Sequence, residues 1–412
     1  MNMQGQQEEI VVGLDIGTTK ICAVVGVTAG KDISIIGIGS HPSVGLRKGV
    51  VVDIESTVDS IKKAVEEAEL MAGCEISSVY AGIAGGHITG FNSRGIIAIK
   101  GQEVTQRDVE RVIEAARAVA IPMDREVIHA LPQEFIVDDQ AGIKNPVGMA
   151  GVRLEVKIHI VTGAVTSAQN IVKATNQAGL EVYDIVLESL ASGEAVLTAD
   201  EKELGSGLLD IGGGTTDLAI FQGKNIKHTF VLALGGHNLT NDIAIGLRAP
   251  HFEAEKIKEQ YGTCLAYNIN PVDTIKVPGM GGRKSRELPR QILGEILEPR
   301  MEEIFALVKR EIYKAEMENI ITSGIVITGG TALLDGITDV AESVFDVPAR
   351  LGKPLGISGL VDIVNNPMYA TGVGLVLYGA RQRSSLTLFN GREKNLFNRL
   401  YSRMKQWLKE II

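Results

Sequence analysis

Apolar and polar positions near the start of the chain follow two different periods. Val, Ile and Gly alternate through residues 10–38, which predicts two or three antiparallel strands joined by tight turns. Residues 56–71 carry apolar side chains at helical spacing, with Ser56 as the expected N-cap and Gly73 as the stop, so we expect an amphipathic helix there. A buried strand is predicted at 79–86.

The pattern changes several times along the rest of the chain. Short strands surround one helix at 105–120 within residues 87–162, which predicts a strand-rich inserted module. Alternation of strand and helix then resumes and includes a helix near 192–197. Residues 241–312 are mainly helical, and 370–380 form the last predicted core helix.

One pattern occurs twice. The segments GLDIGTTKICAVV and LLDIGGGTTDLAIF share an apolar run, Asp, Ile, Gly, a Gly/Thr turn and a second apolar run. The offset from Asp15 to Asp210 is 195 residues, whereas solenoid repeats have periods of about 20–50. We therefore expect two related halves. A third segment, VITGGTALL at 326–334, again places glycines after a strand.

These three segments are suited to holding a polyphosphate. Glycines let successive backbone N–H groups point at an anion. Asp15 and Asp210 would repel phosphate unless Mg²⁺ with its waters lay between them. Each turn taken alone is also compatible with an ordinary tight turn, and no Walker A loop is present. The hydroxyl and ammonium donors nearby are Thr18, Thr19, Thr215, Thr216 and Lys20.

Composition and charge narrow the classes of function. Lys plus Arg total 41 against 50 Asp plus Glu, a formal charge of −9, which argues against a protein devoted to nucleic-acid backbone. The 3 separated cysteines indicate neither a disulfide framework nor a zinc site. The first residues lack a secretion signal and no run of about 18 uncharged apolar residues occurs, so we expect a cytosolic protein. His129 and His159 lie in predicted strands without partner ligands, which favours structural or surface roles over catalysis.

The segment 393–412 carries apolar side chains at helical spacing, flanked by basic residues. Such a helix is too charged to cross a bilayer, so we expect it to lie in the headgroup plane after a polar linker at 381–392. Packing against the chain's own body is the alternative. Residues 381–412 have a local charge of +6 within an acidic protein, which favours an anionic leaflet. The residues expected at the membrane are Leu396, Phe397, Leu400, Arg403, Met404, Trp407, Leu408, Lys409 and Ile411.

In order and residue type, the three glycine segments resemble the phosphate-1, phosphate-2 and adenosine motifs of the actin, Hsp70 and sugar-kinase superfamily. The resemblance implies ATP and Mg²⁺ as ligands, with Asp15 and Asp210 holding the metal through water. The nucleotide-binding residues it implies are Asp15, Gly17, Thr18, Thr19, Lys20, Gly212, Gly213, Gly214, Thr215, Thr216, Glu255, Lys258, Gly329, Gly330 and Thr331.

The same resemblance implies catalytic roles for Glu188 and Asp210. Ser189 stands where the superfamily often has a proline after this glutamate. Glu255 and Lys258 match the pair beside adenine and ribose, although their i, i+3 spacing also suits a surface ion pair.

Chain length, the inserted module and the terminal helix make the sequence similar to the FtsA family of bacterial cell-division proteins. The fold implied is an α/β, actin-like bilobal ATPase fold of duplicated ribonuclease-H-like halves, with an inserted α+β subdomain and a C-terminal amphipathic helix. The domains implied are a first lobe core at 1–82, 163–199 and 360–382, an inserted subdomain at 83–162, a second lobe core at 200–240 and 313–359, a small second-lobe subdomain at 241–312, and a linker with membrane-targeting helix at 383–412.

By this resemblance, the protein would bind ATP, polymerise and tether the FtsZ ring to the cytoplasmic face of the inner membrane at the division septum. The implied partners are the FtsZ C-terminal tail at 241–312, other copies of the chain, later division proteins at 83–162, and an anionic lipid surface, with no nucleic acid. Any ATPase activity would be slow, so enzyme function stays open. The alternatives are a phosphotransferase of the sugar- or acetate-kinase type and an actin-like adaptor of type IV pilus machinery.

Overall fold

The computed structural model describes residues 9–30, 32–279, 281 and 283–388, and its core is a pair of similar sheets. Within these residues the first sheet has six strands. The first three strands pair antiparallel, and the others extend the sheet by parallel pairing. In spatial order they are β11 (Glu181–Leu187), β6 (Ser78–Ile83), β1 (Glu9–Ile16), β2 (Lys20–Ala29), β3 (Asp32–Pro42) and β19 (Ser358–Gly359).

The second sheet repeats this arrangement. Its antiparallel strands β12, β13 and β14 correspond to β1, β2 and β3, and two parallel strands follow on the other side of β12. Asp15 and Asp210 occupy the same position, one residue before the ends of β1 and β12. The predicted duplication is therefore confirmed. The strands are β14 (Asn225–Leu232), β13 (Thr216–Gln222), β12 (Ser206–Ile211), β17 (Ile325–Thr328) and β18 (Ala349–Leu351).

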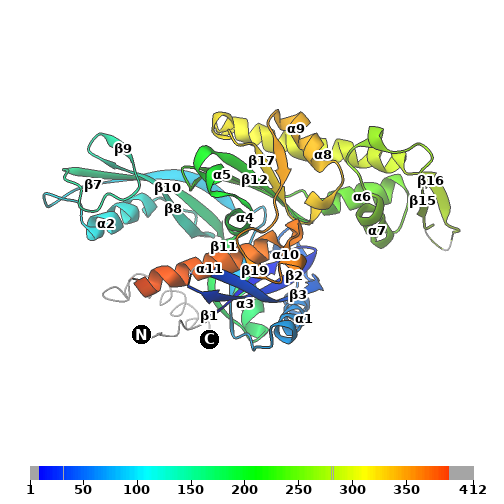
Figure 1. The fold of residues 1–412 in the computed structure, drawn as a ribbon, viewed down its shortest axis with the longest axis horizontal. Coiled ribbons are helices and arrows are strands. Elements are labelled where there is room, and N and C mark those ends of the chain that lie inside the picture. Colours follow the sequence, from blue (N-terminus) through cyan, green and yellow to red (C-terminus); the bar gives the residue numbers. More distant parts are fainter. Residues whose placement is uncertain (1–8, 31, 280, 282, 389–412) are drawn as a thin grey trace.

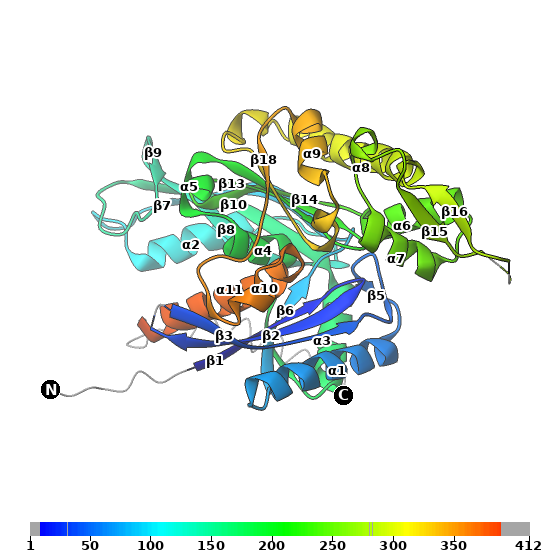
Figure 2. The same ribbon diagram turned by 45° about the vertical axis from the view of Figure 1, so that its right-hand side comes forward.

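Helices cover both faces of the first sheet (Figures 1 and 2). Helices α1 (Ile54–Ala72) and α3 (Val165–Gln177) lie on its outer face. Helix α11 (Ala370–Leu388) lies on the inner face and packs along α4 (Glu188–Val196), which contacts the second sheet. The pair α4 and α11 thus joins the two sheets.

Two predicted helix starts were wrong. Helix α1 begins at Ile54 because the Asp53 carboxylate accepts a hydrogen bond from the Ser56 backbone N–H, so the cap is Asp53 and not Ser56. Helix α4 begins at Glu188 and not near residue 192. This earlier start gives Glu188 a fixed place directly after β11. The predicted stop at Gly73 is confirmed by its left-handed φ of 67°.

The segment between β6 and α3 forms a separate antiparallel sheet with its own apolar core, at the left of Figure 1. Helix α2 (Gln106–Arg117) packs on this sheet and is capped by Thr105. The inserted sheet also contacts β14, where the Gln133 side chain donates to the Ile226 carbonyl over 2.9 Å. Its strands are β7 (Thr89–Ala98), β10 (Arg153–Ala164), β8 (Arg125–Val137) and β9 (Gln140–Ile143).

The other side of the second sheet carries a helical extension with a small hairpin, at the right of Figure 1. Its elements are α6 (Gly236–Gly246), α7 (His251–Tyr261), β15 (Thr274–Val277), β16 (Arg286–Pro289) and α8 (Gln291–Lys314). The short elements elsewhere are β4 (Leu46–Arg47), β5 (Val50–Val51), α5 (Ala199–Leu204), α9 (Ile337–Phe345) and α10 (Val361–Val364).

The chain after residue 380 differs from the prediction. Residues 381–388 continue α11 and are not a linker, because this polar run contains no Gly or Pro to end the helix. The predicted membrane helix at 393–412 lies outside the described residues. In the part of the chain that the structure describes, every helix is too short or too polar to cross a bilayer.

Candidate functional site

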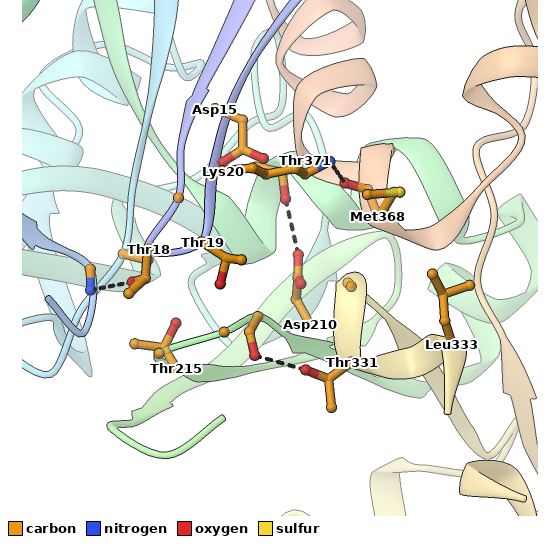
Figure 3. Close-up of a pocket in the computed structure, with 18 of the residues that line it drawn as sticks. Asp15, Thr18, Thr19, Lys20, Asp210, Thr215, Thr331, Leu333, Met368 and Thr371 are labelled. Carbon is orange, nitrogen blue, oxygen red and sulfur yellow. Dashed lines mark hydrogen bonds between the residues drawn. The ribbon is translucent and has the colours of Figure 1, made fainter. Parts of the chain in front are cut away.

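A cavity of about 410 Å³ lies where the repeated hairpins of the two sheets face each other (Figure 3). The two turns have the same hydrogen bond, from Gly17 N–H to the Lys20 carbonyl and from Gly212 N–H to the Thr215 carbonyl. Sixteen of the predicted site residues line the cavity: Asp15, Gly17, Thr18, Thr19, Lys20, Glu188, Asp210, Gly212, Gly213, Gly214, Thr215, Glu255, Lys258, Gly329, Gly330 and Thr331.

Glycine is required where the turns meet. A Cβ atom on Gly213 would lie 1.9 Å from the Thr19 hydroxyl oxygen, and one on Gly214 would lie 2.9 Å from the Lys48 Cα. A side chain on Gly213 would therefore displace the Thr19 side chain, and one on Gly214 would displace the backbone at Lys48. The glycines thus bring backbone N–H groups from both halves to one cavity.

Thr216 is the exception among the predicted residues. Its side chain is fully buried, and its hydroxyl donates to the Leu234 carbonyl over 2.9 Å. Thr216 therefore connects β13 to the segment before α6 and does not line the cavity. The two threonines of the second turn alternate in direction, as successive residues at a strand start do.

Four carboxyl groups lie close together at one wall of the cavity, which Asp15, Glu188 and Asp210 line and Asp217 does not. Burial raises the pKa of Asp15 to about 7, with Lys20 opposing the rise and Asp210 adding to it. Burial raises the pKa of Glu188 well above its ordinary value, and the neighbouring Asp15, Asp217 and Asp210 add to that rise. The pKa of Asp217 rises to about 8 for the same two reasons, burial and nearby Asp210. Without a cation, this cluster favours protonated carboxyls.

The cluster fits a cation that keeps its own waters. Among the described residues, no three carboxylate, His or Cys side chains are placed to hold a metal ion by themselves. Asp217, which pairs with Asp210 across the hairpin but does not line the cavity, has a buried carboxylate oxygen, Oδ1, without a hydrogen-bond partner among the described residues. A hard cation bound through water and one or two carboxylates, with phosphate oxygens completing its shell, matches this donor set.

Asp210 is held by two hydroxyls that sequence reasoning missed. The Ser192 hydroxyl of α4 donates to Asp210 Oδ2. The Thr371 hydroxyl of α11 donates to the same oxygen over 3.1 Å (Figure 3). These bonds lower the pKa of Asp210 against the larger opposing effect of burial. The helices joining the sheets therefore also orient a site carboxylate.

Lys20 points to the rim of the cavity. Its ammonium donates to the Met368 carbonyl over 2.6 Å and lies 4.0 Å from the centre of the Tyr369 ring. Thr18 accepts a hydrogen bond from Gly49 N–H, and Thr19 lies 3.3 Å from His237 Nε2. These three predicted donors thus line the cavity but have protein partners.

The opposite wall contains the Glu255–Lys258 pair from α7. Lys258 is only 7 % exposed, and its ammonium lies 2.8 Å from Glu255 Oε1 and 2.9 Å from the Thr240 hydroxyl. The pair therefore lines the cavity and is not a surface ion pair. Next to it, Thr331 donates to the Gly212 carbonyl, whereas a Cβ on Gly330 would meet nothing within 4 Å. This wall leaves open space for a flat group.

The two histidines have structural partners, as expected. His129 accepts a hydrogen bond from the Leu187 N–H over 3.0 Å. The His159 ring lies between Asn92 and Thr229, at 2.7 and 2.8 Å. Burial lowers the pKa of His129 to about 4 and that of His159 to about 3, the latter with help from His228.

Comparison of the fold defines the class of protein. The chain superposes with a TM-score of 0.66 on a structure titled PilM-PilN type IV pilus biogenesis complex, at 17% identity, covering 90% of this chain and 98% of that chain. It superposes with a TM-score of 0.57 on MreB 5 of Spiroplasma citri bound to AMPPNP, also at 17% identity, covering 94% and 100%. The protein has the actin-like ATPase fold.

Sequence comparison gives the family. A model described as Cell division protein FtsA matches residues 207–374, and one described as SHS2 domain inserted in FTSA matches 85–162. The chain is 53% identical to the cell division protein FtsA of Pseudomonas aeruginosa over 92% of this chain and 91% of that protein. The chain belongs to the FtsA family of cell division proteins.

Proposed function

We propose that this cell division protein binds Mg-ATP in the cleft, assembles into filaments and tethers FtsZ to the cytoplasmic face of the inner membrane. The observation that carries the nucleotide part is the cavity itself. Equivalent hairpins from two duplicated sheets face each other across it, and the glycine segment at 329–331 closes one side. The AMPPNP bound to MreB 5, a protein of the same fold, supports this proposal.

In this proposal each wall of the cavity binds a different part of Mg-ATP. The turn N–H groups and the hydroxyls of Thr18, Thr19 and Thr215 hold the phosphates, and the α7 pair with Gly330 receives the adenosine. Asp15 and Asp210 hold Mg²⁺ through water, and Glu188 orients a water for slow hydrolysis. Mg²⁺, when bound, neutralises phosphate charge. Closure of the two halves on the nucleotide favours the assembling conformation.

Loss of two cavity side chains should weaken ATP binding. The double variant Asp210→Ala, Thr215→Ala removes one carboxylate and one hydroxyl from the wall. We expect its Kd for ATP with Mg²⁺ to rise at least about thirtyfold, about 2 kcal/mol, in equilibrium dialysis with labelled nucleotide. Asp200→Ala, on the exposed surface of α5, is the control. Equal affinity of parent and double variant would refute the nucleotide site.

The partner surfaces follow from the domains proposed above. The helical extension at 241–312 receives the FtsZ tail, and its exposed Phe252, Tyr261 and Tyr267 supply apolar contact area. The inserted subdomain at 83–162 contributes to self-association and to contacts with later division proteins. Family membership supports partners in the division machinery.

Removing residues 393–412 should release the protein from anionic vesicles. The segment combines an apolar stripe with basic flanks, and each basic residue contributes about 1 kcal/mol at an anionic surface. We expect sedimentation with such vesicles to be lost on truncation and in the Trp407→Glu, Leu408→Glu variant. ATP binding should stay unchanged, which controls for folding. Truncated protein that still sediments like the parent would exclude the surface helix.

A further inference from the structure

The inserted subdomain contacts the first sheet at Leu187, one residue before Glu188 of the candidate site. Among the described strands, β11 pairs only with β6 and is the outer strand of its sheet. Strand β8 of the insert lies beside β11, and His129 Nε2 accepts the backbone N–H of Leu187, the last residue of β11. The imidazole is buried, with 7 % of the residue exposed.

The direction of this hydrogen bond determines which nitrogen of the His129 imidazole carries the proton. A backbone N–H can only donate, so Nε2 carries no proton and Nδ1 carries the single proton of the neutral ring. The ring also packs edge-on against Tyr378 of α11, with centroids 6.3 Å apart. His129 therefore acts as a fixed hydrogen-bond acceptor.

The position of Leu187 determines where α4 begins. Leu187 is the N-cap residue of α4, and no side chain caps this helix end. Glu188 is the first residue of the helix and lines the cavity, with its Oε1 only 3.3 Å from where a Cβ on Gly82 would lie. A small shift of the Leu187 backbone would move the Glu188 carboxyl by a similar amount.

We propose that His129 is a positioning residue for the cleft: it holds the Leu187 amide, fixes the start of α4 and so places Glu188. This inference rests on the proposed Mg-ATP function. It makes the inserted subdomain part of the nucleotide site, because β8 supplies the acceptor. By thermodynamic linkage, a partner whose binding moves the insert changes the affinity for Mg-ATP, and Mg-ATP changes the affinity for that partner by the same factor.

Three variants separate the hydrogen bond from the volume of the ring. His129→Gln keeps an acceptor at the reach of Nε2, His129→Asn keeps an amide that is too short to reach, and His129→Leu removes the acceptor. The Kd for ATP is measured for the full chain with Mg²⁺ and with EDTA. We expect Asn and Leu to weaken Mg-ATP about tenfold and ATP in EDTA less than about twofold, with Gln within about threefold of the parent.

A double-variant comparison shows whether the effect passes through Glu188. In a Glu188→Gln background, His129→Asn should add less than about a twofold loss, because the carboxylate that it positions is gone. Any of three results would overturn the inference. The His129 variants could lose the same ATP affinity with and without Mg²⁺, or His129→Asn could lose it fully in the Glu188→Gln background. The third result is an equal Kd for ATP in His129→Gln and His129→Asn. If His129→Leu does not fold, the Gln and Asn pair decides. A parent that binds no ATP would instead overturn the proposed function and, with it, this inference.

Discussion

Raising the pH from about 6.5 to about 8.5 should lower the free energy of unfolding of the nucleotide-free protein by roughly 2 kcal/mol. Burial raises the pKa of Asp15 to about 7, and burial together with Asp210 raises that of Asp217 to about 8. Both lie far above the ordinary value of 3.8. The folded state therefore keeps protons that the unfolded chain has released, and this stability is lost as the pH rises through the folded pKa values.

The buried histidines change stability in the opposite direction, because their contribution rises with pH. They set the lower limit of the pH range in which stability falls. Burial lowers the pKa of His129 to about 4 and of His159 to about 3, so their neutral forms favour the folded state only once the unfolded histidines have lost their protons. At pH 6.5 each unfolded histidine is still half protonated, so about 0.4 kcal/mol per histidine remains to be gained, and the gain is complete above about pH 7.5. Above this pH the carboxyl cluster determines how the free energy of unfolding changes with pH.

Chemical denaturation at a series of pH values measures this effect. Asp217→Asn keeps the shape of the protonated acid and should remove about 2 kcal/mol of the pH-dependent loss. Mg²⁺ with ATP should also reduce the loss, because the cation stabilises ionised carboxylates. A slope unchanged by Asp217→Asn would mean that other groups carry the pH dependence.

Local patterns account for the parts of the site that the sequence predicted. The two hairpins follow from the residues of their own turns, in which the N–H groups of Gly17 and Gly212 each donate to the carbonyl three residues further along the chain. The cap of α1 was misassigned because Asp53 and Ser56 both have suitable side chains, and only backbone geometry separates them. Likewise, the residue types at 381–388 suit a polar linker as well as the last turns of a helix.

The support around Asp210 could not be predicted in this way. Ser192 and Thr371 reach Asp210 from 18 and 161 residues away, through the packing of α4 and α11. Asp217 does have a sequence signal, since it follows the Gly/Thr turn of the second repeat directly, at the start of β13. Its partner across the hairpin is Asp210, whereas Asp15 in the first repeat faces Cys22. This difference between the repeats places the extra carboxyl on one side of the cleft.

Replacing Gly374 with alanine should destabilise the protein by roughly 3 kcal/mol or more, the upper range for overpacked cores. A Cβ on Gly374 of α11 would lie 1.9 Å from the carbonyl oxygen of Ala191 in α4 and 2.3 Å from its carbonyl carbon. Both are backbone atoms, so no side-chain rotation relieves the contact. On its other side α11 meets β1, where a Cβ on Gly13 would lie 2.5 Å from the Gly372 carbonyl oxygen.

The same variant should weaken ATP binding in molecules that remain folded. Moving α4 away from α11 displaces Glu188 and Ser192, whereas moving α11 displaces Thr371, so either movement disturbs the surroundings of Asp210. We expect at least a tenfold rise in the Kd for Mg-ATP, about 1.4 kcal/mol, at a temperature where the variant is folded.

Gly86→Ala is the matched control, because its Cβ would lie 3.5 Å from the nearest atom, the Ala233 Cβ, and its φ is not in the left-handed region. We expect its unfolding free energy to change by less than about 0.5 kcal/mol. Parent-like stability of Gly374→Ala would show that α11 and α4 can separate without cost. Lost stability with unchanged ATP affinity would show that the helices support the fold without orienting the site. Only a loss of both stability and ATP affinity in Gly374→Ala would show that the α4–α11 contact supports the cleft.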